Sequence, residues 1–202
     1  NLFIFNYFDK LIDPNFTYNG KINLNPFFSD LRGNTDKLDL LSLLNSNFFI
    51  IQLIKTELLN NKNLNIDIGI NAKKIKEYHN FNNFFLNLKI QEGLIHLDKT
   101  KLTWENFTDF TILDSLLYVN KNELILDGKL LVDVKNSNEI FKFIQISKKL
   151  RPELKTMELN FNYNFDQKIM NLDSIKVNNQ TSEKVTEVLR TITLKKNKLQ
   201  NR

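Results

Sequence analysis

The residue types that carry out acid–base, nucleophilic or metal chemistry are sparse and scattered in this sequence. The chain has two histidines, His79 and His96, and no cysteine. His79 lies in a polar stretch, and His96 stands between Ile95 and Leu97 on a predicted strand. Catalysis and metal binding need such groups in clusters, so we interpret both histidines as surface or edge residues. The sequence nominates no catalytic residue and no metal ligand, and we expect the protein not to be an enzyme.

The glycines give no sign of a nucleotide site. The chain has five of them, and they stand alone at positions 20, 33, 69, 93 and 128. A loop that cradles phosphate needs closely spaced glycines, as in GxGxxG or GxxxxGK[ST]. We therefore expect no nucleotide, and no other cofactor is indicated.

Length and composition indicate a globular chain of one domain or at most two. The chain has 202 residues, of which 42% are hydrophobic and 25% charged, and that is sufficient for a buried core. Its longest apolar run, residues 48–54 with one glutamine, is far shorter than the roughly 20 residues that span a bilayer. We predict no membrane-spanning segment within this sequence.

The net charge of +5 raises the alternative of nucleic-acid binding. Four of these charges come from basic residues among the last eight positions, so the rest of the chain is almost neutral. Phe161 and Phe165 share the spacing of the apolar Leu159, and the residues between them are rich in asparagine rather than lysine. We expect no nucleic-acid partner. The basic tail is interpreted as a solvated end, with contact to an anionic surface as the alternative.

Apolar and polar residues alternate through the centre and the C-terminal half, which is typical of amphipathic strands. The clearest case runs from Glu123 to Lys135, where the even positions are apolar. Within it, Asp127-Gly128 is compatible with a hairpin turn or with one long strand that bends at the glycine. Further strands are predicted over residues 64–71, 85–90, 94–97 with an extension to Trp104 after a parity change near Asp98, 113–119, 157–165 and 169–177.

Helical signals are fewer and shorter. Ser137 can cap a helix over residues 138–150 that ends before Pro152. Leucine- and isoleucine-rich stretches predict helices over residues 36–44 and 47–59, and a final amphipathic helix follows Ser182. The expected fold class is mainly β (α+β). It is a long antiparallel meander sheet, curved into a groove or partial barrel, with three to four short helices packed on it.

The apolar side of such a sheet has two interpretations. An amphipathic sheet buries that side against helices, a second sheet or a ligand. The predicted helices cover part of it, so the face is either a closed core or a trough that accepts acyl chains. The trough candidates are apolar residues of the regular strands: Leu64, Ile66, Ile68, Leu86, Leu88, Leu124, Leu126, Leu130, Val132, Val134, Leu159, Phe161, Tyr163 and Phe165.

The order of these segments resembles one protein family. The resembling stretch runs from about residue 64 to 178. It contains the segments 63–68 and 72–75, 86–97, 123–130, the helix over 139–149 before Arg151-Pro152, and 159–166. In this order they resemble the AsmA-like proteins of Gram-negative bacteria, which are related to the TamB group.

The resemblance implies a localisation and a partner. AsmA-like proteins are β-rich periplasmic grooves, tethered to the inner membrane by an N-terminal helix and implicated in moving phospholipid toward the outer membrane. We therefore expect a phospholipid partner, and membrane association through an anchor outside this sequence. The expected organisation is a strand and helix region over residues 1–62 packed on the sheet, the AsmA-like meander over 63–179, and a C-terminal helix with a basic tail over 180–202.

Overall fold

A computed structural model describes residues 2–9, 16–40, 49–143, 145 and 147–181 of the chain. Within these residues, twelve strands form a single sheet, and two short α-helices and one 3-10 helix accompany it. The strands are β1 (Leu2–Asp9), β2 (Phe16–Leu24), β3 (Phe27–Leu38), β4 (Asn65–Ile75), β5 (Tyr78–Gln91), β6 (Leu94–His96), β7 (Lys101–Trp104), β8 (Thr108–Asn120), β9 (Glu123–Val134), β10 (Thr156–Asn164), β11 (Ile169–Val177) and β12 (Gln180–Thr181).

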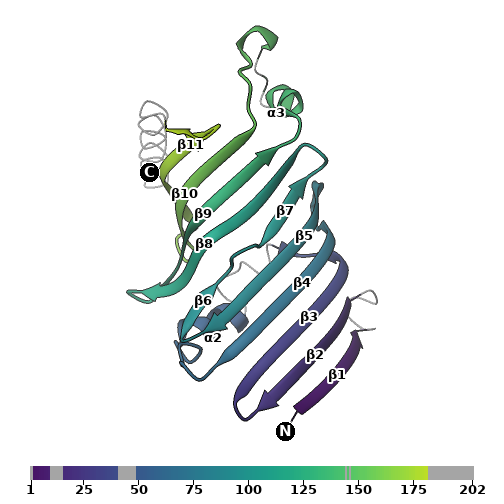
Figure 1. Ribbon diagram of the computed structural model, residues 1–202, viewed down its shortest axis with the longest axis vertical. Helices are drawn as coiled ribbons and strands as arrows, with labels where there is room; N and C mark the ends of the chain where they lie inside the picture. The colour runs from purple at the N-terminus through teal and green to yellow at the C-terminus, as the bar shows by residue number, and fades with distance from the viewer. Residues whose placement is uncertain (1, 10–15, 41–48, 144, 146, 182–202) are drawn as a thin grey trace.

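The strands follow one another through the sheet almost in chain order. The order is β1-β2-β3-β4-β5-β6-β8-β9-β10-β11-β12, and β7 pairs with β5 and β8 beside this path. The described strands form an open partial ring that begins at β1 and ends at β12, and Figure 1 shows the long strands lying side by side. The predicted mainly β meander is confirmed.

One strand pair is parallel rather than antiparallel. β3 and β4 pair in parallel, with Leu31 opposite Ile68 and Gly33 opposite Ile70. The chain between them contains α2 (Phe49–Lys55), and a parallel pair needs such a crossover because the chain must return to the same end of the sheet. Strands β1 to β3, within the region 1–62 where strands and helices were both expected, extend the same sheet.

The helices are shorter than the sequence predicted. The predicted helix 138–150 is α3 (Ser137–Phe143) followed by the 3-10 helix η1 (Lys148–Leu150). The prediction of helix over 36–44 is wrong at 36–38, because these residues end β3 and Leu38 lies opposite Ile75 of β4. Residues 41–48 and the predicted helix and tail after Ser182 lie outside the described residues.

β9 settles the two interpretations of Asp127-Gly128. It is one unbroken strand, in which Gly128 lies opposite Phe161 of β10. A Cβ atom at Gly128 would lie 3.3 Å from the Phe161 ring. The glycine therefore leaves room for an aromatic ring on the sheet rather than forming a turn. The strands predicted over residues 85–90 and 94–97 form a hairpin, and Glu92 and Gly93 in its turn both have positive φ, 55° and 80°.

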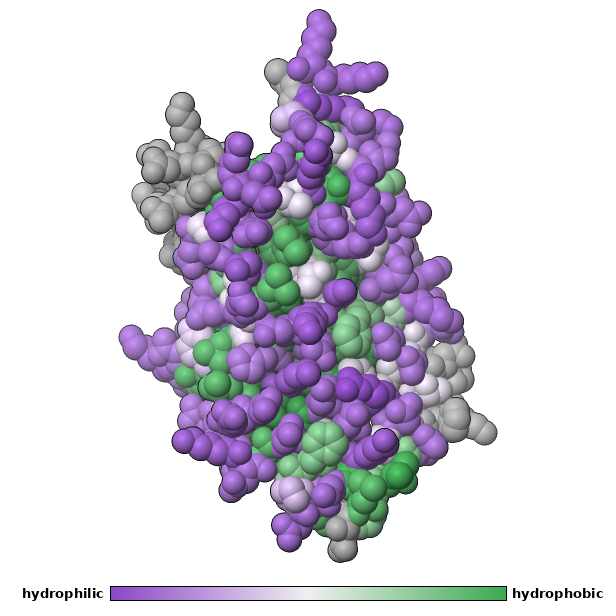
Figure 2. Space-filling model, viewed as in Figure 1, coloured by the Kyte–Doolittle hydropathy of each residue, from purple (hydrophilic) through white to green (hydrophobic). Residues whose placement is uncertain are grey.

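The end strand β1 is apolar on both sides. Leu2, Phe3 and Ile4 are 62%, 54% and 68% exposed. Figure 2 shows a hydrophobic patch at the β1 end of a face that is otherwise mostly hydrophilic. An exposed apolar end strand is the kind of edge to which another strand can add.

Candidate functional site

The fourteen predicted trough residues lie on one face of the sheet, which we call the apolar face. Residues directly opposite each other in paired strands share a face. Ile68 lies opposite Leu88, and Ile66 opposite Ile90. The series continues from Ile90 through Ile95, Leu117 and Leu126 to Tyr163. Alternation within each strand places the remaining candidates on the same face.

Burial divides these candidates into two equal groups. Seven are buried: Leu88, Leu124, Leu126, Val132, Val134, Phe161 and Phe165. The other seven are half-buried: Leu64, Ile66, Ile68, Leu86, Leu130, Leu159 and Tyr163. None of the fourteen is exposed. The apolar face is thus largely shielded from water, and its accessible part is the half-buried strip.

Helix α2 covers one end of the apolar face. Ile51 and Ile54 are 7% and 3% exposed, and they pack against Ile90, Ile95 and Leu124 in the main core cluster. Their spacing of three residues places both side chains on the same side of the helix. Leu58, within the helix predicted over residues 47–59, lies beyond the end of α2 and is exposed.

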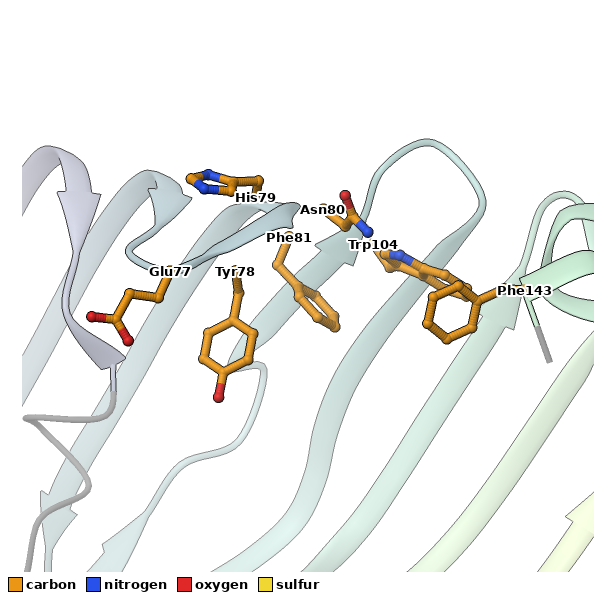
Figure 3. A pocket seen from close by; sticks show the side chains of 7 residues that line it. All are labelled: Glu77, Tyr78, His79, Asn80, Phe81, Trp104 and Phe143. Carbon is orange, nitrogen blue, oxygen red and sulfur yellow. The ribbon is translucent and has the colours of Figure 1, made fainter.

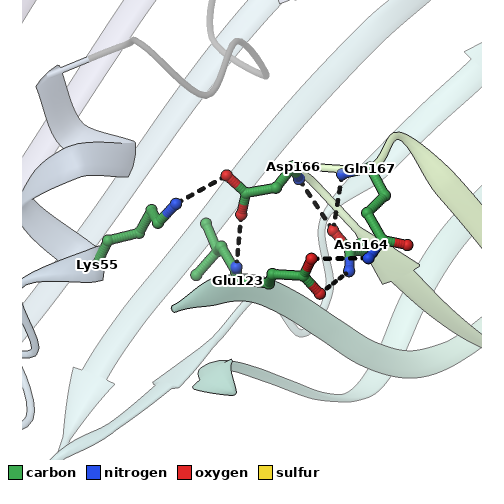
Figure 4. A network of polar contacts seen from close by, with 6 residues as sticks. Lys55, Glu123, Asn164, Asp166 and Gln167 are labelled. Atoms are coloured by element: carbon green, nitrogen blue, oxygen red, sulfur yellow. Dashed lines mark hydrogen bonds and ion pairs between the residues drawn. The ribbon is translucent and has the colours of Figure 1, made fainter. Parts of the chain in front are cut away.

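A polar network fastens α2 to the sheet (Figure 4). The Lys55 ammonium donates to Asp166 Oδ1 at 2.7 Å, and the backbone N–H of Leu124 donates to Asp166 Oδ2 at 2.8 Å. The Lys55 ion pair and the Leu124 N–H hold the pKa of Asp166 below its ordinary value, against burial, which raises it. Beside it, Asn164 and Gln167 donate to the two oxygens of the Glu123 carboxylate. One carboxylate therefore joins the end of α2 to β9 and to the turn after β10.

An aromatic pocket lies at the opposite end of the apolar face (Figure 3). It has a volume of about 430 Å³. Trp104 lies opposite Phe81 in the pairing of β7 with β5, and opposite Thr108 in the pairing with β8. Phe143, in the last turn of α3, packs edge-on against Trp104 at a ring distance of 4.8 Å. The residues lining the pocket are Glu77, Tyr78, His79, Asn80, Phe81, Trp104 and Phe143.

The opposite face of the sheet is polar and charged. Arg32 bridges Asp30 and Asp67 at 2.7 Å and 3.1 Å, and Lys89 lies 3.3 Å from Asp67. Asn160 and Asn162 of β10 donate to Ser174 and Asp127 on this face. The sheet therefore has one wet side and one apolar side, as the alternation indicated.

His96 and Ser115 lie together but do not form a catalytic triad. His96 Nδ1 lies 2.5 Å from the backbone carbonyl oxygen of Ser115, and the Ser115 hydroxyl donates to Asp98 at 2.7 Å. A catalytic triad would instead place the serine hydroxyl against the imidazole. These bonds hold β8 where its register shifts, between Leu113 and Leu116. His79 is exposed beside the aromatic pocket.

Two kinds of feature are absent from the described residues. No group of three or more His, Cys, Asp or Glu side chains is arranged to hold a metal ion. Within the same residues, no helix has the length and apolar character needed to cross a membrane.

Two features of the site were not predicted from the sequence: the aromatic pocket and the ion pair between Lys55 and Asp166. Tyr78 and His79 belong to a polar stretch in the sequence, and Trp104 marks only the end of a strand. The bond between Lys55 and Asp166 joins residues 111 positions apart, and no local pattern connects them. The alternation of side chains within β7 was the one signal in the sequence that could have placed Trp104 on the apolar side.

The chain matches no family model, no curated protein and no solved structure.

Proposed function

We propose that this chain is part of a non-enzymatic, AsmA-like envelope protein that binds phospholipid acyl chains along its apolar face. The observation that carries the proposal is the half-buried strip between α2 and the aromatic pocket. At its centre Leu130 lies opposite Ile112 on one side and Leu159 on the other. These three side chains form a band of aliphatic surface that runs across neighbouring strands.

The dimensions of the apolar face suit an acyl chain. Five inter-strand steps separate β4 from β10 along the sheet, and at about 4.8 Å each they span roughly 24 Å. One leaflet of the hydrocarbon core of a bilayer is about 15 Å thick. A single acyl chain therefore fits across these strands, with its methylene groups against the aliphatic side chains.

The same proposal extends to the place of the protein in the cell. The resemblance to AsmA-like proteins supports a periplasmic location, with tethering to the inner membrane by an anchor outside the sequence. In this setting the apolar face holds or conducts phospholipid in support of outer-membrane biogenesis. The curvature of the sheet and its single apolar side support this assignment.

A second candidate function is a structural or adaptor domain with a closed core and no ligand. The observation that favours it is the shielding of the apolar face, on which none of the fourteen candidates is exposed. In that case Leu130 and Leu159 pack against protein, and a charge at either position has no access to solvent or lipid.

Native mass spectrometry of the gently purified chain separates the two functions, with Leu130→Lys as the diagnostic variant. We expect the wild type to carry phospholipid. We expect Leu130→Lys to stay folded and to lose the lipid, because desolvating the ammonium against acyl chains costs several kcal/mol. The matched control is Leu131→Lys, one residue along β9 on the opposite face, which is expected to keep its lipid.

Two results would favour the closed core instead. One is a wild-type protein that carries no lipid. The other is a Leu130→Lys variant that fails to fold while Leu131→Lys folds, because an unpaired charge would then be buried in a packed interior.

A further inference from the structure

Four rings of the aromatic pocket form two pairs, and the rings within each pair stand nearly perpendicular to each other. Tyr78 and Phe81 have ring centroids 6.4 Å apart with an interplanar angle of 78°, and Trp104 and Phe143 have centroids 4.8 Å apart at 72°. These four rings come from β5, β7 and α3. In Figure 3 their side chains extend to the same side of the sheet. Rings at right angles form walls of different orientation around the same space.

The charge of the pocket is negative. Glu77 is the one lining residue with a full charge when His79 is counted as neutral. The adjacent lysines are neutralised elsewhere: Lys76 lies 3.2 Å from Asp39, and Lys142 pairs with Glu139. Aromatic ring faces carry partial negative charge from their π-electrons. The pocket therefore combines apolar walls with a field that attracts cations.

We infer that the aromatic pocket binds a quaternary ammonium group, and that the group is the choline head of a phospholipid. A quaternary ammonium carries a full charge but no N–H to satisfy, so aromatic walls replace its weak hydration and attract its charge. Three of the four rings, Phe81, Trp104 and Phe143, have no oxygen acceptor for the N–H donors of a primary ammonium. Glu77, on the outer side of Tyr78, adds a negative charge at the rim of the pocket.

The position of the pocket links this inference to the proposed function, on which its lipid part rests. Tyr78 lies opposite Ile75, which forms a second, smaller core cluster with Ala72 and Phe84. Trp104 shares its strand face with Leu102, which packs against this second cluster. The pocket thus opens at the end of the apolar face that α2 leaves uncovered. A lipid whose acyl chain lies along that face would place its head group at the aromatic pocket.

Trp104 reports on this site directly because it is the single tryptophan of the chain. The experiment titrates the full chain with choline and follows tryptophan fluorescence. The comparison ligand is 3,3-dimethylbutan-1-ol, which has the shape of choline without its charge. We expect saturable binding of choline, and binding of the neutral alcohol weaker by about tenfold, as expected for loss of the cation–π attraction and the carboxylate pairing.

Two variants locate the binding. Phe143→Leu removes a ring that is 66% exposed, so the fold is retained, and we expect choline affinity to fall about threefold. Glu77→Gln removes the carboxylate and is expected to lower affinity by a similar factor. Phe3→Leu, which removes an exposed ring from β1, is the control and should leave the titration unchanged. Equal binding of choline and the neutral alcohol, or unchanged affinity in both pocket variants, would overturn the inference.

A second arm distinguishes the lipid head group from free choline. A short-chain phosphatidylcholine should bind more tightly than choline and more tightly than the matching phosphatidylglycerol. Equal affinities of choline and the phosphatidylcholine would overturn the lipid part of the inference and leave a site for free quaternary ammonium ions. The choline titration does not depend on the strip at Leu130. Choline binding by a protein that carries no lipid would therefore refute the proposed function and not the pocket.

Discussion

Phe161→Asp is expected to lower the free energy of unfolding by about 3 kcal/mol or more, because it removes a buried aromatic side chain and buries a carboxylate in its place. Phe161 is 7% exposed and belongs to the core cluster that includes Ile51 and Ile54 of α2. Its ring lies over Gly128. Because its neighbours in this cluster are hydrophobic, the new carboxylate would be unpaired. Urea unfolding followed by circular dichroism measures the change.

The neighbouring residue gives the matched control. Asn160 is exposed on the polar face, where it donates to Ser174 at 2.8 Å. Asn160→Asp is expected to change the free energy of unfolding by no more than about 0.5 kcal/mol. Similar losses in the two variants would show that the apolar and polar faces are assigned to the wrong sides of β10.

Asp166→Asn is expected to destabilise the protein by about 1–3 kcal/mol, because it removes the acceptor charge for Lys55 and weakens the bond to the backbone of Leu124. The Lys55 and Asp166 side chains are 15% and 25% exposed, so water replaces their pairing only in part. Lys55→Met removes the same ion pair from the helix side. In a double-mutant cycle the two losses should not add, because each variant removes the same bond. Additive losses would contradict the role of this pair in holding α2.

The pH dependence of the Asp166 contribution follows from its lowered pKa. The folded protein holds the pKa of Asp166 below its ordinary value of 3.8. The ion pair therefore stabilises the fold fully above that value, and its contribution is lost as the pH falls through the lowered pKa. The wild type should lose more stability than Asp166→Asn between about pH 5 and pH 2. Asp173→Asn, which removes an exposed carboxyl on β11, should follow the wild type.

Much of the sheet follows from the alternation of apolar and polar residues. In β9 and β10 each second residue is apolar, and the structure pairs these residues across the two strands, as with Leu126 and Tyr163. A period of two specifies both the strand and its inward side, because a shift of one residue would expose the entire apolar set. This is why the trough candidates, which lie in or beside four strands, fall on a single face.

The features of the structure that the sequence did not predict depend on contacts between segments that lie far apart in the chain. The residues around Leu38 are typical of a helix, but Leu38 pairs in parallel with β4. The local sequence gives no sign of this partner strand. The aromatic pocket joins Tyr78, Trp104 and Phe143 from three elements. Their spacing in the sequence carries no period, so only the fold brings their rings together.

Photo-crosslinking from β10 tests the central proposal most directly. A photoreactive phenylalanine analogue at Leu159 would project from the half-buried strip, where Leu159 lies opposite Leu130. The same analogue at Asn160 would project from the polar face. After illumination in cells that synthesise phospholipid, we expect an adduct of phospholipid mass at position 159 and none at position 160. Absence of a lipid adduct at position 159, or equal adducts at both positions, would contradict the assignment of the apolar face as an acyl-chain site.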